Sequence, residues 1–213
     1  MICSDEAGLY NFVKTTTFHF HTTPESIAFL SRSCPNITDS GSTQSCDASC
    51  KSKWELIVGL RDSASLTYID CNTFQQSNIS LNEKEWDTHV SFTPLALSVS
   101  PCSQFLLVAT DKNMHIVYLI GTNKKLRVFA GHSCGDYGKP RVWWDNSGRY
   151  VYSNSDNGNS IVVYSVASQR VIATMTGHRS SIRDIAHHHS KNLLVSASFD
   201  KTLKVWCASA PDI

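Results

Sequence analysis

The sequence predicts an all-β fold in which about four similar units of sheet follow one another along the chain. Two recurring patterns lead to this prediction. An apolar, strand-like run that ends in an aspartate occurs four times, and a histidine with a large apolar residue three positions before it occurs four times as well. In addition, no unit shows the 3.6-residue apolar period of an amphipathic helix. The repeat is therefore the main organising feature of the chain.

The aspartates set the first of these two registers. Consecutive aspartates of the pattern lie 44 to 49 residues apart, and each is followed by a second β-rich run. Each unit is thus predicted to contain a strand, a tight turn and a second strand. The first runs are Glu55–Asp62, Phe105–Asp111, Tyr150–Asp156 and Leu193–Asp200, and the second runs are Leu66–Ile69, His115–Tyr118, Ile161–Tyr164 and Leu203–Trp206.

The histidines set the second register. Their spacings are 68, 43 and 46 residues, and the long first interval contains the stretch 31–53, rich in Ser, Thr, Asn and Asp. This stretch is predicted to be a surface loop. It is either a carrier of phosphorylation sites or an insertion without a role. The register consists of His21, His89, His132 and His178, preceded by Phe18, Trp86, Phe129 and Met175.

The last unit shows the predicted strands most clearly, because strand-like runs are expected at 181–187, 193–198 and 202–207. It resembles the WD40 repeat: Gly177-His178 opens it, and a Leu-Val-Ser-Ala-Ser-Phe-Asp-Lys-Thr-Leu-Lys-Val-Trp run ends at Trp206. The third unit also opens with a Gly-His pair at 131–132. The resemblance implies a β-propeller, or a partial propeller, of about four WD40-like four-stranded antiparallel blades.

In the family, a His, a Ser or Thr, an Asp and a Trp commonly form a buried hydrogen-bonded set within one blade. The resemblance carries these roles to His178, Ser196, Asp200 and Trp206, with His132, Asp156, Asp111 and Asp62 as the corresponding structural residues of the other blades. The sequence departs from the family pattern elsewhere. Cys207 replaces the signature Asp, the other units end in Tyr68, Tyr118 and Tyr164, and His21 and His89 lack the preceding Gly.

These patterns divide the chain into an N-terminal tail (1–9), a propeller region (10–207) and a C-terminal tail (208–213). Within the propeller region, we expect an isolated outer strand at 10–20 and a last blade with three strands only. The blades are expected at 21–86, with the loop 31–53 inserted, and at 87–130, 131–176 and 177–207. Two arrangements stay open: a closed four-bladed ring completed by the strand at 10–20, or the C-terminal part of a larger propeller whose further blades would act as partners.

Composition excludes several classes of function. The formal net charge is +1, so no basic field for nucleic acid is expected. No apolar stretch is long enough to cross a membrane, and the first ten residues do not resemble a secretory signal. The eight cysteines are too dilute for a disulfide scaffold. An intracellular location, in cytoplasm or nucleus, is predicted, with no membrane partner.

The sequence contains no strong candidate for a metal, catalytic or cofactor site. The run His187-His188-His189 cannot bind one metal ion from a regular strand, because consecutive side chains point to opposite faces. Cys46 and Cys50, with Cys34 upstream, lack a fourth zinc ligand. No nucleophile elbow, phosphate loop or dinucleotide motif occurs. We therefore predict no enzyme activity, no metal site and no cofactor.

Binding is the favoured function: a scaffold or complex subunit that presents propeller loops to partner proteins or peptides. Alternatives are a ubiquitin-ligase substrate receptor that reads modified peptides and a propeller hydrolase with a metal in its central channel. Arg and aromatic side chains are common interface anchors, and the loops on one face of the blades offer several. The candidates are Arg179, Arg183, Phe199, Lys201, Tyr137 and Lys139.

Overall fold

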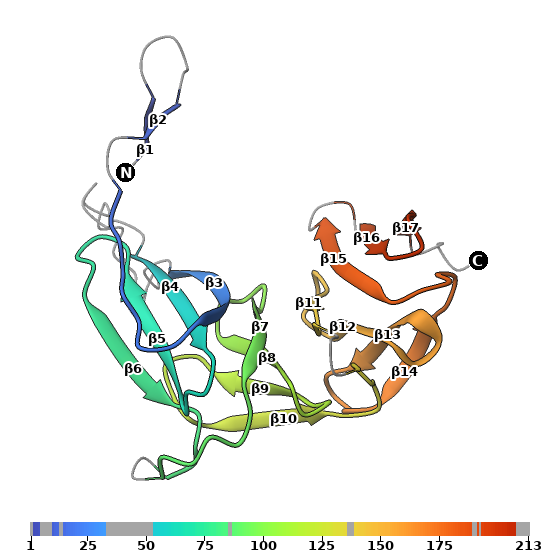
Figure 1. Cartoon of the computed structure of the whole chain (residues 1–213), viewed down its shortest axis with the longest axis horizontal. Helices are drawn as coiled ribbons and strands as arrows, with labels where there is room; N and C mark the ends of the chain where they lie inside the picture. Colours follow the sequence, from blue (N-terminus) through green and yellow to red (C-terminus); the bar gives the residue numbers. More distant parts are fainter. Residues whose placement is uncertain are drawn as a thin grey trace, which may run out of the picture.

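The computed structural model describes residues 2–4, 10–12, 15–32, 53–84, 87–135, 139–188, 191 and 193–207, and it confirms the all-β prediction. Four antiparallel sheets follow one another as blades 1 to 4 (Figure 1). The predicted loop 31–53 is shorter at its ends than expected, because residues 31 and 32 belong to β3 (Pro24–Arg32) and residue 53 begins β4 (Lys53–Leu60); its remainder lies outside the described residues. Blade 1 is β3 (Pro24–Arg32), β4 (Lys53–Leu60), β5 (Ser65–Asp70) and β6 (Gln76–Ser80); blade 2 is β7 (Pro94–Val99), β8 (Phe105–Thr110), β9 (His115–Leu119) and β10 (Lys125–Phe129).

Blades 3 and 4 follow the same order from the inner to the outer strand. In blade 4, β17 pairs with β16, and no fourth strand is present among the described residues. Blade 3 is β11 (Val142–Trp144), β12 (Tyr150–Ser155), β13 (Ser160–Ser165) and β14 (Val171–Met175), with the short 3-10 turn η1 (Asn157–Asn159); blade 4 is β15 (Ile182–His188), β16 (Leu193–Ser198) and β17 (Leu203–Cys207).

The continuous apolar runs of the sequence become the second strand of each blade, and in β8 both faces of this strand are covered. In β8, Leu106 and Val108 point into the core between blades 1 and 2. Their neighbours Leu107 and Ala109 point into the core between blades 2 and 3. All four are fully buried. A strand buried on both faces loses the polar alternation of a surface strand, which explains the pattern.

Tight turns connect the strands where the sequence predicts them. Between β11 and β12, the Asp145 carboxylate accepts hydrogen bonds from the Ser147 amide (3.0 Å) and the Tyr150 amide (2.8 Å). Gly148 adopts a φ of +67°, which a glycine tolerates without steric cost. This turn closes the hairpin and fixes its register, with Val142 opposite Ser153.

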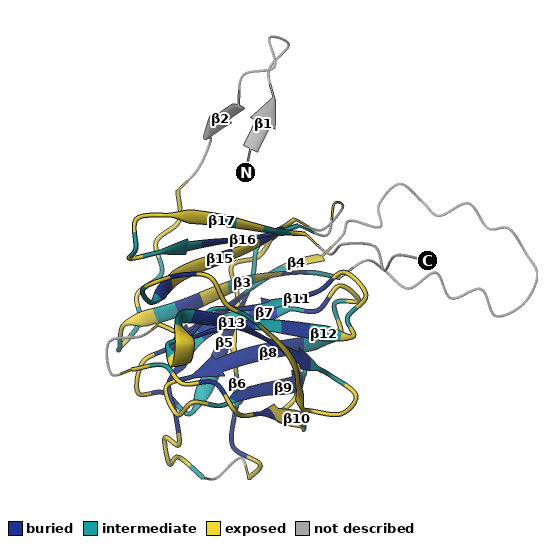
Figure 2. Ribbon diagram, turned by 90° about the vertical axis from the view of Figure 1, so that its right-hand side faces the viewer, coloured by how far each residue is buried: buried dark blue, intermediate teal, exposed yellow. Residues whose placement is uncertain are grey.

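The blades form an arc that is open between β3 and β15 (Figure 1). Neighbouring inner strands contact one another in the order β3, β7, β11, β15. The stretch 10–20, expected as an outer strand, contains β2 (Tyr10–Phe12), which pairs with β1 (Ile2–Ser4). Figure 2 shows that the strands in the middle of the stack are buried, whereas β17 at its end is exposed. The two arrangements expected from the sequence, a four-bladed ring of this chain alone and the C-terminal part of a larger propeller, both stay predictions.

Candidate functional site

Four side chains of blade 4 form the hydrogen-bonded set that the family resemblance assigns. His178 Nδ1 lies 2.9 Å from Asp200 Oδ2, and His178 Nε2 lies 2.8 Å from Ser196 Oγ. The Trp206 indole N–H donates to the same Ser196 oxygen at 2.9 Å. The set joins the loop before β15 to both β16 and β17. It therefore fixes the blade geometry from which the neighbouring loops project.

Asp200 also organises the turn between β16 and β17. Its Oδ1 accepts hydrogen bonds from the Thr202 hydroxyl (2.7 Å) and amide (2.9 Å), and its Oδ2 accepts one from the Arg179 amide (2.9 Å). The hydrogen bond from the Thr202 hydroxyl has the largest effect on the Asp200 carboxyl, and the Arg179 amide and His178 add to it. Together they hold the pKa of Asp200 far below its usual range. The carboxylate is thus ionised at neutral pH and ties two loops together.

Blade 3 uses the corresponding residues differently. His132 Nδ1 lies 3.0 Å from the hydroxyl of Tyr164, the residue that takes the place of the tryptophan. Asp156 does not reach His132 and instead accepts the Gly135 amide at 2.7 Å. The Tyr164 hydroxyl lies beside His132 inside the blade, in the position where blade 4 has its tryptophan. Asp156 bonds the loop that precedes β11 instead of the histidine.

A second histidine, which the sequence did not single out for this role, enters blade 3 from blade 2. His115 in β9 stacks on His132 with ring centroids 3.7 Å apart and an interplanar angle of 12°. Its Nε2 lies 2.6 Å from Ser153 Oγ. Burial, and then the neighbouring His132, hold the pKa of His115 well below its usual value, and burial lowers the pKa of His132 to about 4. Both rings are neutral at pH 7.

The remaining two aspartates of the repeat lie in turns. Asp111 accepts the Thr93 amide at 2.8 Å and has Lys112 Nζ at 3.6 Å. Asp62 is exposed and adopts a φ of +52° in the turn between β4 and β5. The four repeat aspartates are therefore equivalent in sequence position but not in their contacts, since Asp200 alone of these four bonds a histidine.

The candidate partner-binding residues of blade 4 are exposed at the start of β15 and in the loops beside it. The Arg183 guanidinium carbon lies 4.7 Å from the centroid of the Phe199 ring, and Phe199 is 61% exposed. The Phe199 amide donates to the Ser181 carbonyl at 3.1 Å, which holds the two loops together. Arg179 and Lys201 are exposed beside them. Blade 4 thus displays an aromatic ring and a stacked cation on a hydrogen-bonded base.

The two candidate partner-binding residues of blade 3 are Tyr137 and Lys139. Tyr137 lies outside the described residues. Lys139 is exposed, and its Nζ lies 4.0 Å from Glu25 Oε2 in blade 1. The same carboxylate accepts the Arg61 Nε at 2.7 Å. Lys139 is therefore part of a charged cluster with Glu25 and Arg61 of blade 1.

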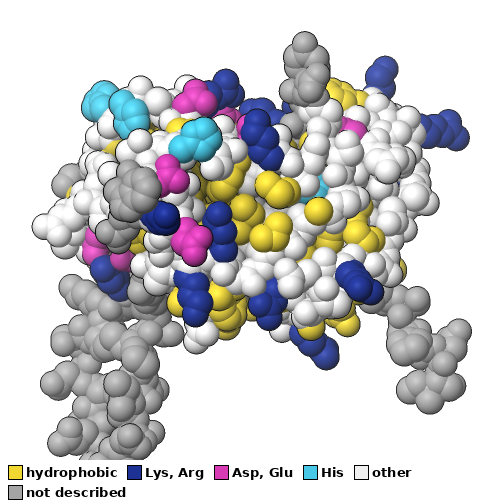
Figure 3. All heavy atoms as spheres, turned by 90° about the horizontal axis from the view of Figure 1, so that it is seen from below, with side chains coloured by type: hydrophobic (Ala, Val, Ile, Leu, Met, Phe, Trp, Pro, Cys, Tyr) yellow, Lys and Arg dark blue, Asp and Glu magenta, His cyan; other side chains and the backbone are white. Residues whose placement is uncertain are grey.

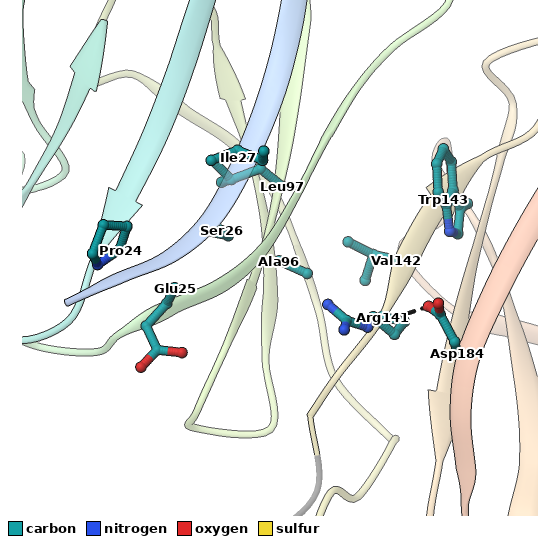
Figure 4. A pocket seen from close by; sticks show the side chains of 10 residues that line it. All are labelled: Pro24, Glu25, Ser26, Ile27, Ala96, Leu97, Arg141, Val142, Trp143 and Asp184. Carbon is teal, nitrogen blue, oxygen red and sulfur yellow. Dashed lines mark ion pairs between the residues drawn. The ribbon is translucent and has the colours of Figure 1, made fainter. Parts of the chain in front are cut away.

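A cavity of about 520 Å³ opens between the inner strands of the four blades (Figure 4). Arg141 Nε and Asp184 Oδ1 form an ion pair at 3.3 Å at its edge, and Glu25 faces them from blade 1. Ile27, Leu97 and Trp143 supply an apolar wall. No motif in the sequence indicates this cavity, because its lining comes from four strands that only blade packing brings together.

An apolar patch with basic neighbours lies on the outer strands of blades 2 and 3. Val128 in β10 is 41% exposed, and its amide donates to the Gln169 side chain of blade 3. Val171 and Ile172 in β14 continue the patch, and Arg127 bonds across to the Val166 carbonyl. Figure 3 shows hydrophobic side chains among Lys and Arg on the side of the arc seen from below.

The described residues contain neither a cluster of metal ligands nor a membrane-spanning helix. In that part of the chain, no three His, Cys, Asp or Glu side chains gather closely enough to hold a metal ion. His187 and His188 belong to β15, where the first is buried and the second is exposed. Cys34, Cys46 and Cys50 lie outside the described residues. No described helix is long and apolar enough to span a membrane.

One blade of the chain matches a known family. The description "WD domain, G-beta repeat" fits residues 169–207, which contain the His178, Ser196, Asp200 and Trp206 set. Among solved structures, the WD40 repeats of RRP9 superpose with a TM-score of 0.62 at 15% identity. The match covers 89% of this chain and 49% of the RRP9 chain. At that identity, the likeness concerns the fold.

Curated relatives match over shorter stretches. A bromodomain and WD repeat-containing protein of Dictyostelium discoideum is 32% identical over 83 residues, 39% of this chain and 4% of the relative. The periodic tryptophan protein 2 homolog of Schizosaccharomyces pombe is 32% identical over 62 residues (29% and 7%). Human pre-mRNA-processing factor 19 is 34% identical over 47 residues (22% and 9%). The chain thus spans less than a tenth of the length of each relative.

Proposed function

The chain belongs to the WD40-repeat β-propeller family, and we propose that it is a non-enzymatic subunit of a protein complex, which binds a partner protein or peptide through the loops of blade 4. The observation that carries this proposal is the pair formed by Arg183 and Phe199. An exposed aromatic ring with a guanidinium stacked on it combines the two side-chain types that contribute most to protein interfaces.

Rigidity of the base supports the proposal. Arg183 lies in β15 and Phe199 follows β16 directly, and these two strands are joined in one ladder. The His178 set ties the adjacent loop to the same sheet. A partner that binds there loses little free energy to the ordering of loops, since they are already held. Arg179 and Lys201 at the edge favour a partner with an acidic or polar flank.

The alternatives have less support. A reader of phosphorylated peptides needs several arginines whose guanidinium groups are available and converge. Two arginines on the inner side of the arc are already paired, Arg61 with Glu25 and Arg141 with Asp184. For a propeller hydrolase, no described cluster of carboxylates and histidines favours a metal in the channel. The intracellular location stays a prediction from the sequence.

Quantitative affinity purification from the source cells tests the proposal. The bait is the whole chain, either unchanged, with Arg183→Ala and Phe199→Ala together, or with the control Lys125→Ala on β10. We expect a set of proteins that the unchanged chain and the control retain and the double variant loses. Direct binding of one of these to the purified chain should then weaken by at least tenfold in the double variant. Equal retention by all three baits would contradict the proposal.

A further inference from the structure

The blade 4 end of the arc exposes a surface that the inner blades bury. Leu203 and Val205 in β17 are 72% and 65% exposed. Val205 pairs with the third residue of the second strand of its blade, as Val163 does in blade 3. Val163 is 8% exposed because blade 4 covers it. The positions that carry Leu203 and Val205 are therefore covered by a following blade wherever one is present.

The blade 1 end exposes the complementary surface. Ile27 and Phe29 in β3 are 61% and 65% exposed. Ile27 pairs with the residue two positions before the end of the second strand, and so do Val142 in blade 3 and Ile185 in blade 4. These two counterparts are 3% and 2% exposed, since each packs against the preceding blade. Ile27 therefore faces the place of a preceding blade.

The outer strands also differ between the two ends of the arc. Phe18 and Phe20 pack on the blade 1 residues Val58, Leu60 and Ile69. In the histidine register, Phe18 corresponds to Phe129, which ends the outer strand of the blade before its own histidine. The stretch 15–20 thus lies where the outer strand of a preceding blade would lie, and no inner strands of such a blade occur among the described residues. Blade 4, in contrast, has three strands and lacks an outer one among the described residues.

We propose that two copies of this chain assemble head to tail into one closed ring of eight blades, with blade 4 of each copy packed against blade 1 of the other. A twofold axis supplies each arc with both surfaces that it lacks. The stretch 15–20 of one copy then lies beside β17 of the other. The size of the arc agrees, because the superposition covers 49% of the RRP9 propeller chain.

Closure of the ring would bury apolar side chains that are exposed at both ends of a single arc. The contact would repeat the packing already present at the three interfaces within the chain, so it requires no new kind of surface. It would bury Leu203, Val205, Ile27 and Phe29, and removal of apolar side chains from water favours association. It would also cover the outer edge of β17, which pairs with no further strand among the described residues and could otherwise pair with unrelated strands. The proposal does not depend on the Arg183–Phe199 surface.

Light scattering of the purified 213-residue chain tests this proposal. At micromolar concentration we expect twice the chain mass of 23.6 kDa, and small-angle X-ray scattering should give a closed disc. Val205→Glu at one end and Phe29→Glu at the other should each give the mass of one copy. Both side chains are exposed in the single arc, so circular dichroism should show folded sheet in both variants. Ile172→Glu, at a 53% exposed position on β14, is the matched control and should stay dimeric.

Two results would overturn the proposal. One is a monomeric unchanged chain across the concentration range, which is expected if further blades from another source cover the two ends. The other is a dimer whose dissociation constant is unchanged by both Val205→Glu and Phe29→Glu, since the two copies would then meet at a different surface.

Discussion

His178 and Ser196 are joined at the centre of blade 4, with His178 Nε2 2.8 Å from Ser196 Oγ. Ser196 is fully buried, and its hydroxyl oxygen also accepts the Trp206 indole N–H. One small side chain therefore satisfies two buried ring nitrogens from different segments. The geometry of the blade 4 loops depends on this shared oxygen.

Replacement of Ser196 by alanine should lower the free energy of unfolding by about 1–3 kcal/mol. The Trp206 N–H and the His178 nitrogen would lose their common partner while they stay buried. Urea denaturation followed by Trp fluorescence measures the change. The control is Ser77→Ala in β6, an exposed serine whose replacement should alter stability by less than about 0.5 kcal/mol. Equal effects of the two variants would show that the shared oxygen contributes no stability.

The stacked pair of His115 and His132 predicts an acid-sensitive interface between blades 2 and 3. Both folded-state pKa values are lowered, that of His132 to about 4, so the stability that comes from these neutral rings is complete above about pH 6.5. As the pH falls from about 6.5 towards 4, the unfolded chain binds protons that the folded chain excludes. Stability should then decrease by up to about 1.4 kcal/mol per pH unit for each histidine.

Thermal melts between pH 7.5 and 4.5 measure this dependence. His132→Gln should flatten the slope by about one proton, whatever its effect on stability at pH 7.5. His89→Gln is the control, because His89 is exposed. A slope that is the same in the unchanged chain and in His132→Gln would rule out the buried pair as its source.

Gly59 is predicted to be intolerant of a side chain. A Cβ at this position in β4 would lie 2.5 Å from Ser26 Oγ and 2.9 Å from Pro94 Cγ. The Ser26 hydroxyl donates to the Pro94 carbonyl at 2.7 Å and links blades 1 and 2. Gly59→Ala should therefore destabilise the chain by about 1–3 kcal/mol, as expected for overpacking.

A double-mutant cycle separates this clash from a general effect on the strand. In a Ser26→Ala background, Gly59→Ala should cost less than it does alone, because one of the two colliding groups is gone. Strict additivity of the two substitutions in chemical denaturation would contradict a contact between these positions.

Arg183→Ala and Phe199→Ala should separate binding from folding. Both side chains are exposed, so we expect each variant to unfold within about 0.5 kcal/mol of the unchanged chain. If the pair anchors a partner, each replacement should weaken binding by about 1–3 kcal/mol. Calorimetric titration with the purified partner, beside a denaturant melt, gives both quantities. A large loss of stability would mean that the pair holds the blade together instead.

The sequence alone determined the β-repeat and the order of its strands. The run Phe105–Asp111, for example, coincides with β8 and the turn residue that follows it. Such strands can be predicted because both faces are buried, which leaves a continuous apolar run between polar turns. The contacts among His178, Ser196, Asp200 and Trp206 follow the same logic, since all four lie within one blade and one motif.

Only the tertiary structure decided which residues from different blades meet. His115 reaches His132, and Arg141 reaches Asp184, because the packing of one blade on the next sets these distances. No local pattern encodes such contacts. Likewise, the repeat makes Asp156 and Asp200 equivalent, but Tyr164 in place of a tryptophan offers His132 a hydroxyl and changes the partners. The opening of the arc is likewise visible only in the tertiary structure. The strands at its two ends are as apolar in sequence as those between the inner blades, so the sequence pattern does not distinguish an exposed surface from a buried one.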